Sequence, residues 1–481
     1  MSNARRLLVG SVYTYGAQLF TIAAQFGYAA LTSRLVDEEG FGFYGVALAI
    51  SALFVLVSSS GMSQTVGRLL TLDRNVIGTL LTYSVVVGGL VAAVNCLLAN
   101  PLSSAWGVPG AQGVVLLLAI NTLTAPLFGL VTGLARRLGA FKFLAAVTLS
   151  ANVTGMILGG LFTAFRPEAT SLVISSLLAQ TVVVVVCFVR FRRYVKPTLR
   201  LPSKDLLVFS WSLLGLSMIQ YASSTLPRFG ASNVLGAPAI GQWNRAEVLT
   251  TLPFQQLQTA IVPVLYPEFR HDRHDASRSL TLWPDLLCLL AWVTLPLGVV
   301  GSAVIPWLLP VVLGAEWRQA GLLGIPLCLA GGIQPATVLL SSALEAVGRL
   351  RIVVSSSLLA LAVQGVAMAL VFHQRSIWPA VVALPVVYAI MHAYQIFAAA
   401  RAGLLSLQLL LRRYGSLALF TISLAIAAHA TAIALSTSSR VATAAALIGS
   451  GAVAFRLLRW SSLPPVTLAR ELGLLRKGSS D

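Results

Sequence analysis

Long uncharged stretches constrain this chain more than any other feature of its sequence. Between successive Asp, Glu, Lys or Arg residues lie runs such as Leu7–Ser33, Gly40–Gly67 and Asn75–Ala135. A helix needs about 20 mostly apolar residues to cross the hydrocarbon core of a bilayer, so each of these runs is long enough. With 57% hydrophobic and 10% charged residues, the composition is also far from that of a soluble globular protein. We therefore predict an all-α polytopic membrane protein.

Read as helices, the uncharged runs predict about fourteen transmembrane spans. The run from Asn75 is long enough for two of them, and Asn100-Pro101 and Gly107-Val108-Pro109-Gly110 supply turn residues between the two. The predicted spans are 10–33, 41–66, 76–98, 112–134, 143–165, 169–189, 206–227, 240–265, 286–305, 321–344, 352–372, 377–398, 415–436 and 441–459.

The distribution of basic residues orients the predicted spans. A cytoplasmic N-terminus places most of the 33 Lys and Arg residues in cytoplasmic segments, as the positive-inside rule requires. Both termini are then expected to be cytoplasmic. The net charge of +18 follows from this topology and does not indicate a nucleic-acid partner. The first span is too long for a signal peptide.

An internal repeat is indicated by landmarks that recur in the same order. Gly42-Phe43-Tyr44 opens the second span as Gly241-Gln242-Trp243 opens the eighth, and Gly107 precedes the fourth as Gly314 precedes the tenth. We expect two six-helix lobes in pseudo-two-fold relation, followed by two C-terminal helices. The predicted divisions are an N-lobe (1–190), a cytoplasmic linker (191–205), a C-lobe (206–400), an interfacial segment (401–414), spans thirteen and fourteen (415–460) and a cytoplasmic tail (461–481).

Polar side chains recur every three or four residues along several predicted spans, which places them on one helical face. For Ser and Thr, packing between helices is the ordinary explanation. A glutamine amide has more hydrogen-bonding positions and is harder to satisfy there, so such residues favour a wet lumen. We expect spans one, seven, eight and ten to line it. The candidate cargo contacts on these stripes are Gln18, Gln25, Tyr221 and Gln334.

Arginines near the outer ends of the spans are the charged candidates. Arg34 and Arg228 follow the first predicted span of each lobe, and Arg245 lies within the eighth. Snorkelling to the headgroup level is the alternative explanation, especially for Arg34. Guanidinium groups bind phosphate oxygens in pairs, so arginines facing a cavity favour an anionic cargo. Glu247 is the candidate coupling residue.

No cofactor or metal is predicted. Cys96, Cys187, Cys288 and Cys328 all lie in apolar runs, where packing is the expected role. The sequence has no phosphate-binding G-x-x-x-x-G-K-[ST] loop, so we expect uphill transport to draw on an ion gradient or on cargo made continuously on one side.

Four segments carry a family resemblance. They are Leu31-Thr32-Ser33-Arg34-Leu35 with Gly40-Phe41-Gly42-Phe43-Tyr44, Leu235-Gly236-Ala237-Pro238-Ala239-Ile240-Gly241-Gln242-Trp243-Asn244-Arg245-Ala246, Pro263-Val264-Leu265-Tyr266-Pro267, and Leu313-Gly314-Ala315-Glu316-Trp317-Arg318-Gln319-Ala320. In these patterns the chain resembles the polysaccharide repeat-unit flippases (the Wzx class) of the multidrug/oligosaccharidyl-lipid/polysaccharide exporter superfamily.

The resemblance implies a V-shaped, two-lobed inner-membrane protein that flips a polyprenyl-pyrophosphate-linked oligosaccharide by alternating access, for cell-surface polysaccharides such as lipopolysaccharide. The headgroup would cross a cationic cavity and contact Arg34, Arg228 and Arg245, while the polyprenyl tail stays in membrane lipid. Expected partners are the lipid-linked glycan and, further, a polysaccharide polymerase and other biosynthesis proteins.

Three rival functions remain open at the level of the sequence. An ion-coupled small-molecule exporter of the same superfamily would share the fold, although the first span carries no acidic residue. An integral-membrane glycosyltransferase or polymerase generally needs a large outer loop, which is absent between the predicted spans. A major-facilitator carrier also has two sets of six spans, but its usual loop spacing is not present. We therefore predict a transporter and not an enzyme.

Overall fold

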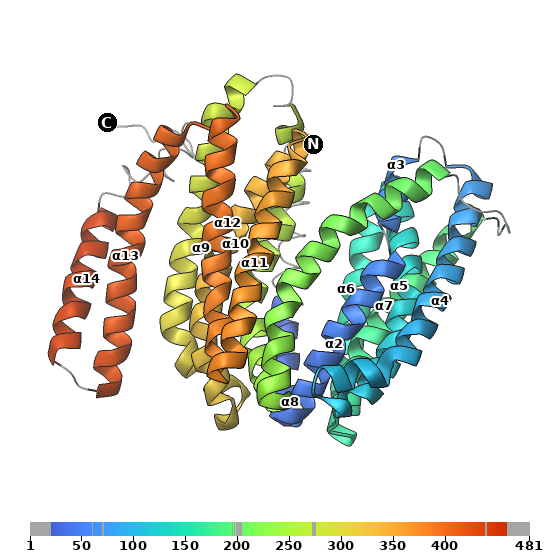
Figure 1. The fold of residues 1–481 in the computed structure, drawn as a ribbon, viewed down its shortest axis with the longest axis horizontal. Coiled ribbons are helices and arrows are strands. Elements are labelled where there is room, and N and C mark those ends of the chain that lie inside the picture. Colours follow the sequence, from blue (N-terminus) through green and yellow to red (C-terminus); the bar gives the residue numbers. More distant parts are fainter. Residues whose placement is uncertain are drawn as a thin grey trace. The chain divides into compact units, whose positions relative to one another are not determined.

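The computed structural model describes residues 21–59, 61–69, 72–194, 196, 198, 204–271, 276–437 and 440–458. Within these ranges every regular element is a helix, which confirms the all-α prediction (Figure 1). Residues 21–33 are helical as well. The other elements are α2 (Glu38–Ser59), α3 (Met62–Arg68), α4 (Arg74–Ala105), η1 (Pro109–Ala111), α5 (Gln112–Arg137), α6 (Phe141–Phe165), α7 (Ala169–Phe191), η2 (Arg192–Tyr194), α8 (Lys204–His271), α9 (Ala276–Leu313), η3 (Ala315–Trp317), α10 (Arg318–Ala346), α11 (Leu350–Gln374), α12 (Trp378–Arg401), α13 (Leu407–Thr437) and α14 (Arg440–Leu458).

Ten candidate spans among the described residues are long and apolar enough to cross a membrane. Each coincides with one predicted span, so a multi-pass membrane protein is confirmed. Of the other four predicted spans, 10–33 lies partly outside the described residues, 206–227 and 240–265 fall within α8, and 441–459 corresponds to α14. The total of fourteen stays a prediction.

The predicted hairpin between the third and fourth spans is present as α4 and α5, which pack against each other. The prediction that Asn100-Pro101 forms part of its turn is wrong, because Pro101 lies inside α4. Transmembrane helices tolerate proline when neighbouring groups satisfy the freed backbone carbonyl. The chain turns instead at Gly107, whose φ of 68° is a left-handed conformation that favours glycine.

Landmarks of the predicted repeat share local geometry. Gly107 and Gly314 both have positive φ, and each is followed by a short 3₁₀ helix and then by a long helix, α5 or α10. Gly139 and Gly348 both have positive φ directly after those two helices. Each pair of landmarks therefore has positive φ at the same place in the order of helices, although φ is 68° at Gly107 and 130° at Gly314.

α8 covers both the seventh and the eighth predicted spans. Its helical geometry breaks at Gly236, where φ is 78° and ψ is −171°, a combination that is essentially restricted to glycine. The prediction that the first half ends just before Arg228 is therefore wrong. Arg228 lies inside the helix, because the backbone stays helical until Gly236.

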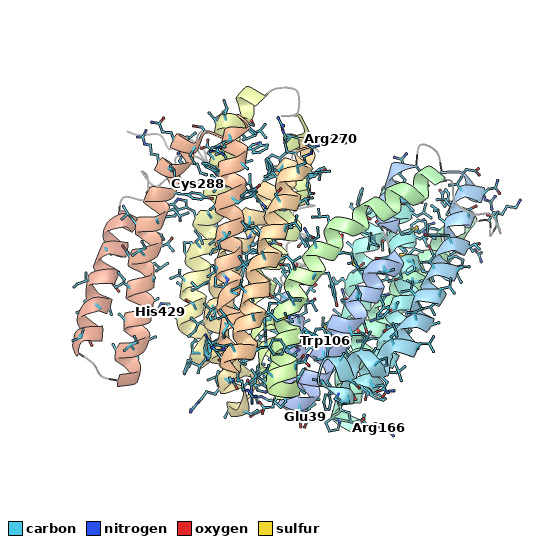
Figure 2. The ribbon with its side chains drawn as sticks, viewed as in Figure 1. Glu39, Trp106, Arg166, Arg270, Cys288 and His429 are labelled. Carbon is cyan, nitrogen blue, oxygen red and sulfur yellow. The ribbon has the colours of Figure 1, made fainter. Side chains whose placement is uncertain are left out.

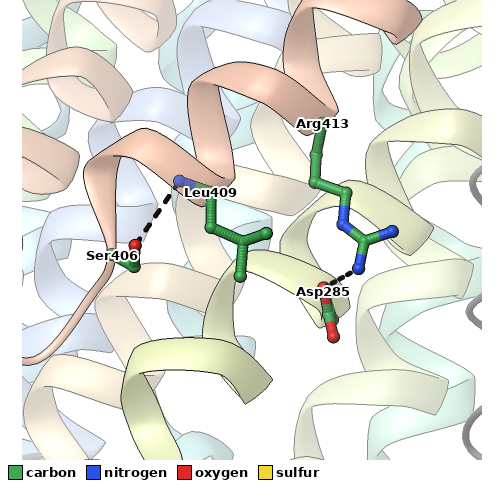
Figure 3. Close-up of polar contacts among 4 residues, drawn as sticks. All are labelled: Asp285, Ser406, Leu409 and Arg413. Carbon is green, nitrogen blue, oxygen red and sulfur yellow. Dashed lines mark hydrogen bonds and ion pairs between the residues drawn. The ribbon is translucent and has the colours of Figure 1, made fainter.

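The predicted interfacial segment 401–414 is also different in the structure. Residues 402–406 form the turn, and α13 begins at Leu407. The Ser406 hydroxyl accepts a hydrogen bond from the Leu409 backbone N–H at 3.4 Å, and Arg413 pairs with Asp285 of α9 at 3.0 Å (Figure 3). The segment is predicted to be separate because Arg412 and Arg413 follow its uncharged residues. In the structure Asp285 on α9 pairs with Arg413, so the helix includes both arginines.

Contacts divide the chain into two units. The first contains residues up to Arg245 together with Met368–Ile377, and the second contains Ala246–Ala367 and the residues from Trp378 onward. The predicted lobe and linker boundaries stay predictions. In the first unit, α5 packs against α2, α3, α4 and α7; in the second, α10 packs against α9 and α12, and α13 packs against α9 and α14. Glu39 and Arg166 lie at one end of the first unit (Figure 2), and the predicted topology places both on the outer side.

Candidate functional site

Arg245 is the most deeply buried of the three candidate arginines. Its side chain is 6% exposed, and its guanidinium carbon lies 3.9 Å from the centroid of the Phe41 ring, a cation–π distance. One terminal N–H group donates to the Asn244 side-chain oxygen at 2.8 Å, while Nε has no hydrogen-bond partner. No carboxylate among the described residues forms an ion pair with it. The structure therefore holds a buried guanidinium that an aromatic ring and an amide only partly satisfy.

Arg228 and Tyr221 lie on the first half of α8 and are half-buried. The Arg228 guanidinium carbon is 5.4 Å from the centroid of the Trp243 ring. The Tyr221 hydroxyl donates to the Ala49 carbonyl of α2 at 2.8 Å, so it joins two helices. Tyr221 is therefore engaged in helix packing in this structure, and its predicted contact with cargo stays untested.

The candidates near the N-terminus fall into two groups. Gln18 lies outside the described residues. Gln25 is half-buried, and its side-chain oxygen is buried without a hydrogen-bond partner, which fits a polar stripe that packing alone does not satisfy. Arg34 is exposed in the turn that follows residues 21–33. Its exposure agrees with the snorkelling alternative as well as with contact to a headgroup.

Glu247 and Gln334 belong to the second unit. Both side chains are half-buried, on α8 and α10 respectively. The backbone carbonyl of Glu247 accepts hydrogen bonds from the hydroxyls of Thr250 and Thr251, at 3.3 and 2.8 Å. The described contacts thus group Arg34, Arg228 and Arg245 in one unit and leave the roles of Glu247 and Gln334 as predictions.

A reciprocal contact between α2 and the second half of α8 was not anticipated. A β-carbon at Gly42 would overlap the carbonyl group of Ala237, and one at Gly241 would overlap the carbonyl of Glu38. Each of these carbonyls lies four residues before the other glycine, so the two segments contact each other symmetrically, as copies do across a two-fold axis. The Gln242 amide also donates to the Glu38 carboxylate.

This contact joins Gly42 and Gly241, which the sequence pairs only as equivalent positions of a predicted repeat. Gly42 and Gly241 open equivalent spans, and small residues allow helix backbones to approach closely in membranes. The sequence signal was present, but glycine recurs so often in this chain that spacing alone did not show that the two positions meet. Arg245 lies one turn beyond Gly241, which places the buried guanidinium beside the contact.

A many-span helical protein with repeated landmarks and a buried charge has the architecture of a secondary transporter. Comparison with known protein families finds a matching family. Residues 31–322, more than half of the chain, match the family described as polysaccharide biosynthesis protein, and the chain belongs to this family.

Curated relatives agree with this assignment. The chain is 21% identical over 323 residues to the lipopolysaccharide biosynthesis protein WzxC of Escherichia coli (strain K12), covering 66% of this chain and 65% of that protein. It is 20% identical over 327 residues to an uncharacterized membrane protein in the cps region of Klebsiella pneumoniae, covering 66% of each. The matches therefore span just under two thirds of the length of these relatives.

Solved structures show the fold. A lipid II flippase, MurJ, in an inward closed conformation aligns with a TM-score of 0.72 and 12% identity, covering 96% of this chain and 99% of that one. An inward-facing multidrug resistance MATE family transporter of the MOP superfamily aligns with a TM-score of 0.57 and 14% identity, covering 79% and 95%. The chain therefore shares its fold with these two proteins, which are named as a flippase and as a transporter.

Proposed function

We propose that this protein flips a polyprenyl-pyrophosphate-linked oligosaccharide from the cytoplasmic to the outer leaflet of the bacterial inner membrane, by alternating access, for the synthesis of a cell-surface polysaccharide. The family match and the relatives named for polysaccharide biosynthesis support the role in that process. The solved structure with the same fold is named as a flippase of a lipid, lipid II, which supports a lipid-linked cargo.

The observation that carries this proposal is the environment of Arg245. A charged side chain in the membrane is expensive, and such residues usually mark a substrate or ion pathway. Here the buried guanidinium is in contact with a ring and an amide, and no ion pair with a carboxylate is present in the described structure. A pyrophosphate group supplies the missing negative charge and accepts paired hydrogen bonds from a guanidinium. A cationic drug would be repelled by this guanidinium.

Deletion of the gene tests the proposal in cells. Lipid-linked oligosaccharide should accumulate in the cytoplasmic leaflet, and the wild-type protein should restore its transfer. Arg245→Ala should insert normally yet reduce transfer by at least about tenfold, because hydrogen bonds to charged groups are worth about 1.5–3 kcal/mol. The readout is the leaflet distribution of the extracted lipid-linked glycan.

Arg166→Ala is the matched control, because Arg166 is an exposed arginine in the turn between α6 and α7. It should support normal transfer. An unchanged leaflet distribution of every lipid-linked glycan in the deletion strain would exclude the proposal. The small-molecule exporter would then become the preferred function, and loss of resistance to an exported compound would identify it.

A further inference from the structure

A cavity with a mixed polar and apolar lining lies within the first unit. It has a volume of about 370 Å³ and is lined by α2, α3, α5, α7 and the first half of α8. Ligand pockets span roughly 300–1,000 Å³, so this cavity lies within their range. None of its lining residues is charged. The lining combines polar residues (Ser59, Ser63, Gln64, Gln180 and Ser217) with apolar ones (Val55, Leu56, Met62, Ala125, Phe128 and Leu214).

Gln180 is held in place by its surroundings. Its side-chain N–H₂ group donates to the Asn121 carbonyl of α5 at 3.0 Å and to the Thr124 hydroxyl at 2.7 Å. Asn121 in turn donates to the Ser176 hydroxyl at 3.5 Å. Both donor hydrogens of the Gln180 amide are therefore used behind the cavity wall, so its carbonyl oxygen is the group left to accept a hydrogen bond.

Gln64 presents the complementary group. It is exposed on α3, lines the cavity and makes no hydrogen bond in the described structure. Its amide has both donors and an acceptor available. Ser63 and Phe128 also line the cavity. By the predicted orientation, α3 is at the cytoplasmic end of its span, where cargo enters.

The chemistry of this lining selects a ligand class. A charged group is not matched by a wall that mixes amides and hydroxyls with apolar side chains, because a buried charge needs a charged or metal partner. A purely apolar tail would leave the amides unsatisfied. A saccharide presents hydroxyls that both donate and accept, together with C–H faces that pack on aromatic rings. Such a wall fits neutral sugar hydroxyls.

We propose that this cavity is a saccharide-binding subsite, which takes the sugar nearest the cytoplasmic opening while phosphate is bound elsewhere. The inference rests on the proposed function and deepens it, since it assigns selection of the glycan to Gln64 and Gln180 and retention of the pyrophosphate to arginine. Selection of sugar and selection of anion are then separable by mutation.

Binding of two probes to the full-length protein in nanodiscs tests this inference. One probe is lipid-linked oligosaccharide extracted from cells that lack the transporter, and the other is undecaprenyl pyrophosphate without sugar. Gln64→Leu and Gln180→Leu should each weaken binding of the first probe by about three- to tenfold, since each removes a hydrogen-bond partner of the sugar, which is worth about 0.5–1.5 kcal/mol. Binding of the second probe should change less than twofold.

Two further variants separate the possible outcomes. Gln374→Leu replaces an exposed glutamine at the end of α11 and should bind both probes normally. Arg245→Ala should weaken both probes. Because Gln64 makes no hydrogen bond in the described structure, Gln64→Leu should keep the melting temperature of the wild type even if Gln180→Leu lowers it.

The inference is overturned if folded Gln64→Leu binds the oligosaccharide probe as the wild type does. It is also overturned if the wild-type protein does not distinguish the two probes, which would leave a cavity that holds only water. If the wild-type protein binds neither probe, the proposed function fails and the saccharide subsite fails with it. Normal binding of both probes by Arg245→Ala would remove the arginine from the proposed function without touching the subsite.

Discussion

Individual residues set the chemistry of the first unit. Arg245 is buried against Phe41 and Asn244, whereas Arg34 is exposed in a turn. Both are candidates from their positions in the sequence, where snorkelling is a stronger alternative for Arg34 than for Arg245. Spacing shows that an arginine lies in a span, but only tertiary packing decides which ring or amide covers it.

The close approach at Gly42 leads to a prediction at this scale. Gly42→Ala introduces a β-carbon that overlaps the Ala237 carbonyl, so α2 and α8 must separate. Overpacking of this kind typically costs about 1–3 kcal/mol. The melting temperature of the purified variant should fall, and a cysteine introduced beside the contact should react faster with a water-soluble reagent.

Gly89→Ala is the control for this experiment. Gly89 lies in α4, and nothing lies within 4 Å of a β-carbon placed there. Alanine has a better helix propensity than glycine, so this variant should be as stable as the wild type or slightly more stable. Equal stability of Gly42→Ala and Gly89→Ala would show that the two backbones are not in close contact.

Whole helices were predicted more reliably than their ends. The uncharged runs located the candidate spans because apolar length is what a bilayer requires. They failed where a local feature overrides composition. Gly236 allows the break in α8, and Asp285 pairs with Arg413, which lies inside α13. Neither feature is visible in hydropathy, since one is a backbone angle and the other is a pairing between distant segments.

The ion pair between Asp285 and Arg413 gives a prediction at the scale of helix packing. The two side chains are 16% and 20% exposed, so the pair is largely but not fully desolvated. Removing one partner of a buried pair costs about 3–5 kcal/mol; partial exposure reduces this, and we expect about 1–3 kcal/mol for Asp285→Asn. The measurement is the melting temperature in detergent.

Exchange of the two charges provides the control. Asp285→Arg alone should destabilise the protein more than Asp285→Asn, because it places two cations together. The double variant Asp285→Arg, Arg413→Asp should recover part of the lost stability. If stability is not recovered, the charges do not hold α13 against α9. Apolar packing, with Leu417 and Phe420 buried beside Cys288, then holds the two helices together.

The first unit of the molecule holds two candidate sites, one with a buried arginine and one without charged residues. Arg245 lies beside the reciprocal glycine contact, and the cavity that holds Gln64 and Gln180 lies among α2, α3, α5, α7 and α8. The sequence predicted polar helix faces but not this cavity, because its wall is assembled from helices distant in the chain. Lipid-linked glycans carry both an anion and a neutral sugar, and the proposed function assigns a separate group of residues to each.

Transfer of lipid-linked oligosaccharide by the purified protein in proteoliposomes tests the central claim most directly. A membrane-impermeant enzyme modifies only the glycan in the exposed leaflet, so the fraction of glycan that it has modified reports transfer from the other leaflet. We predict that this fraction rises with time when wild-type protein is present and stays near its starting value with Arg245→Ala. Equal exposure with wild-type protein, with Arg245→Ala and with empty liposomes would contradict the account.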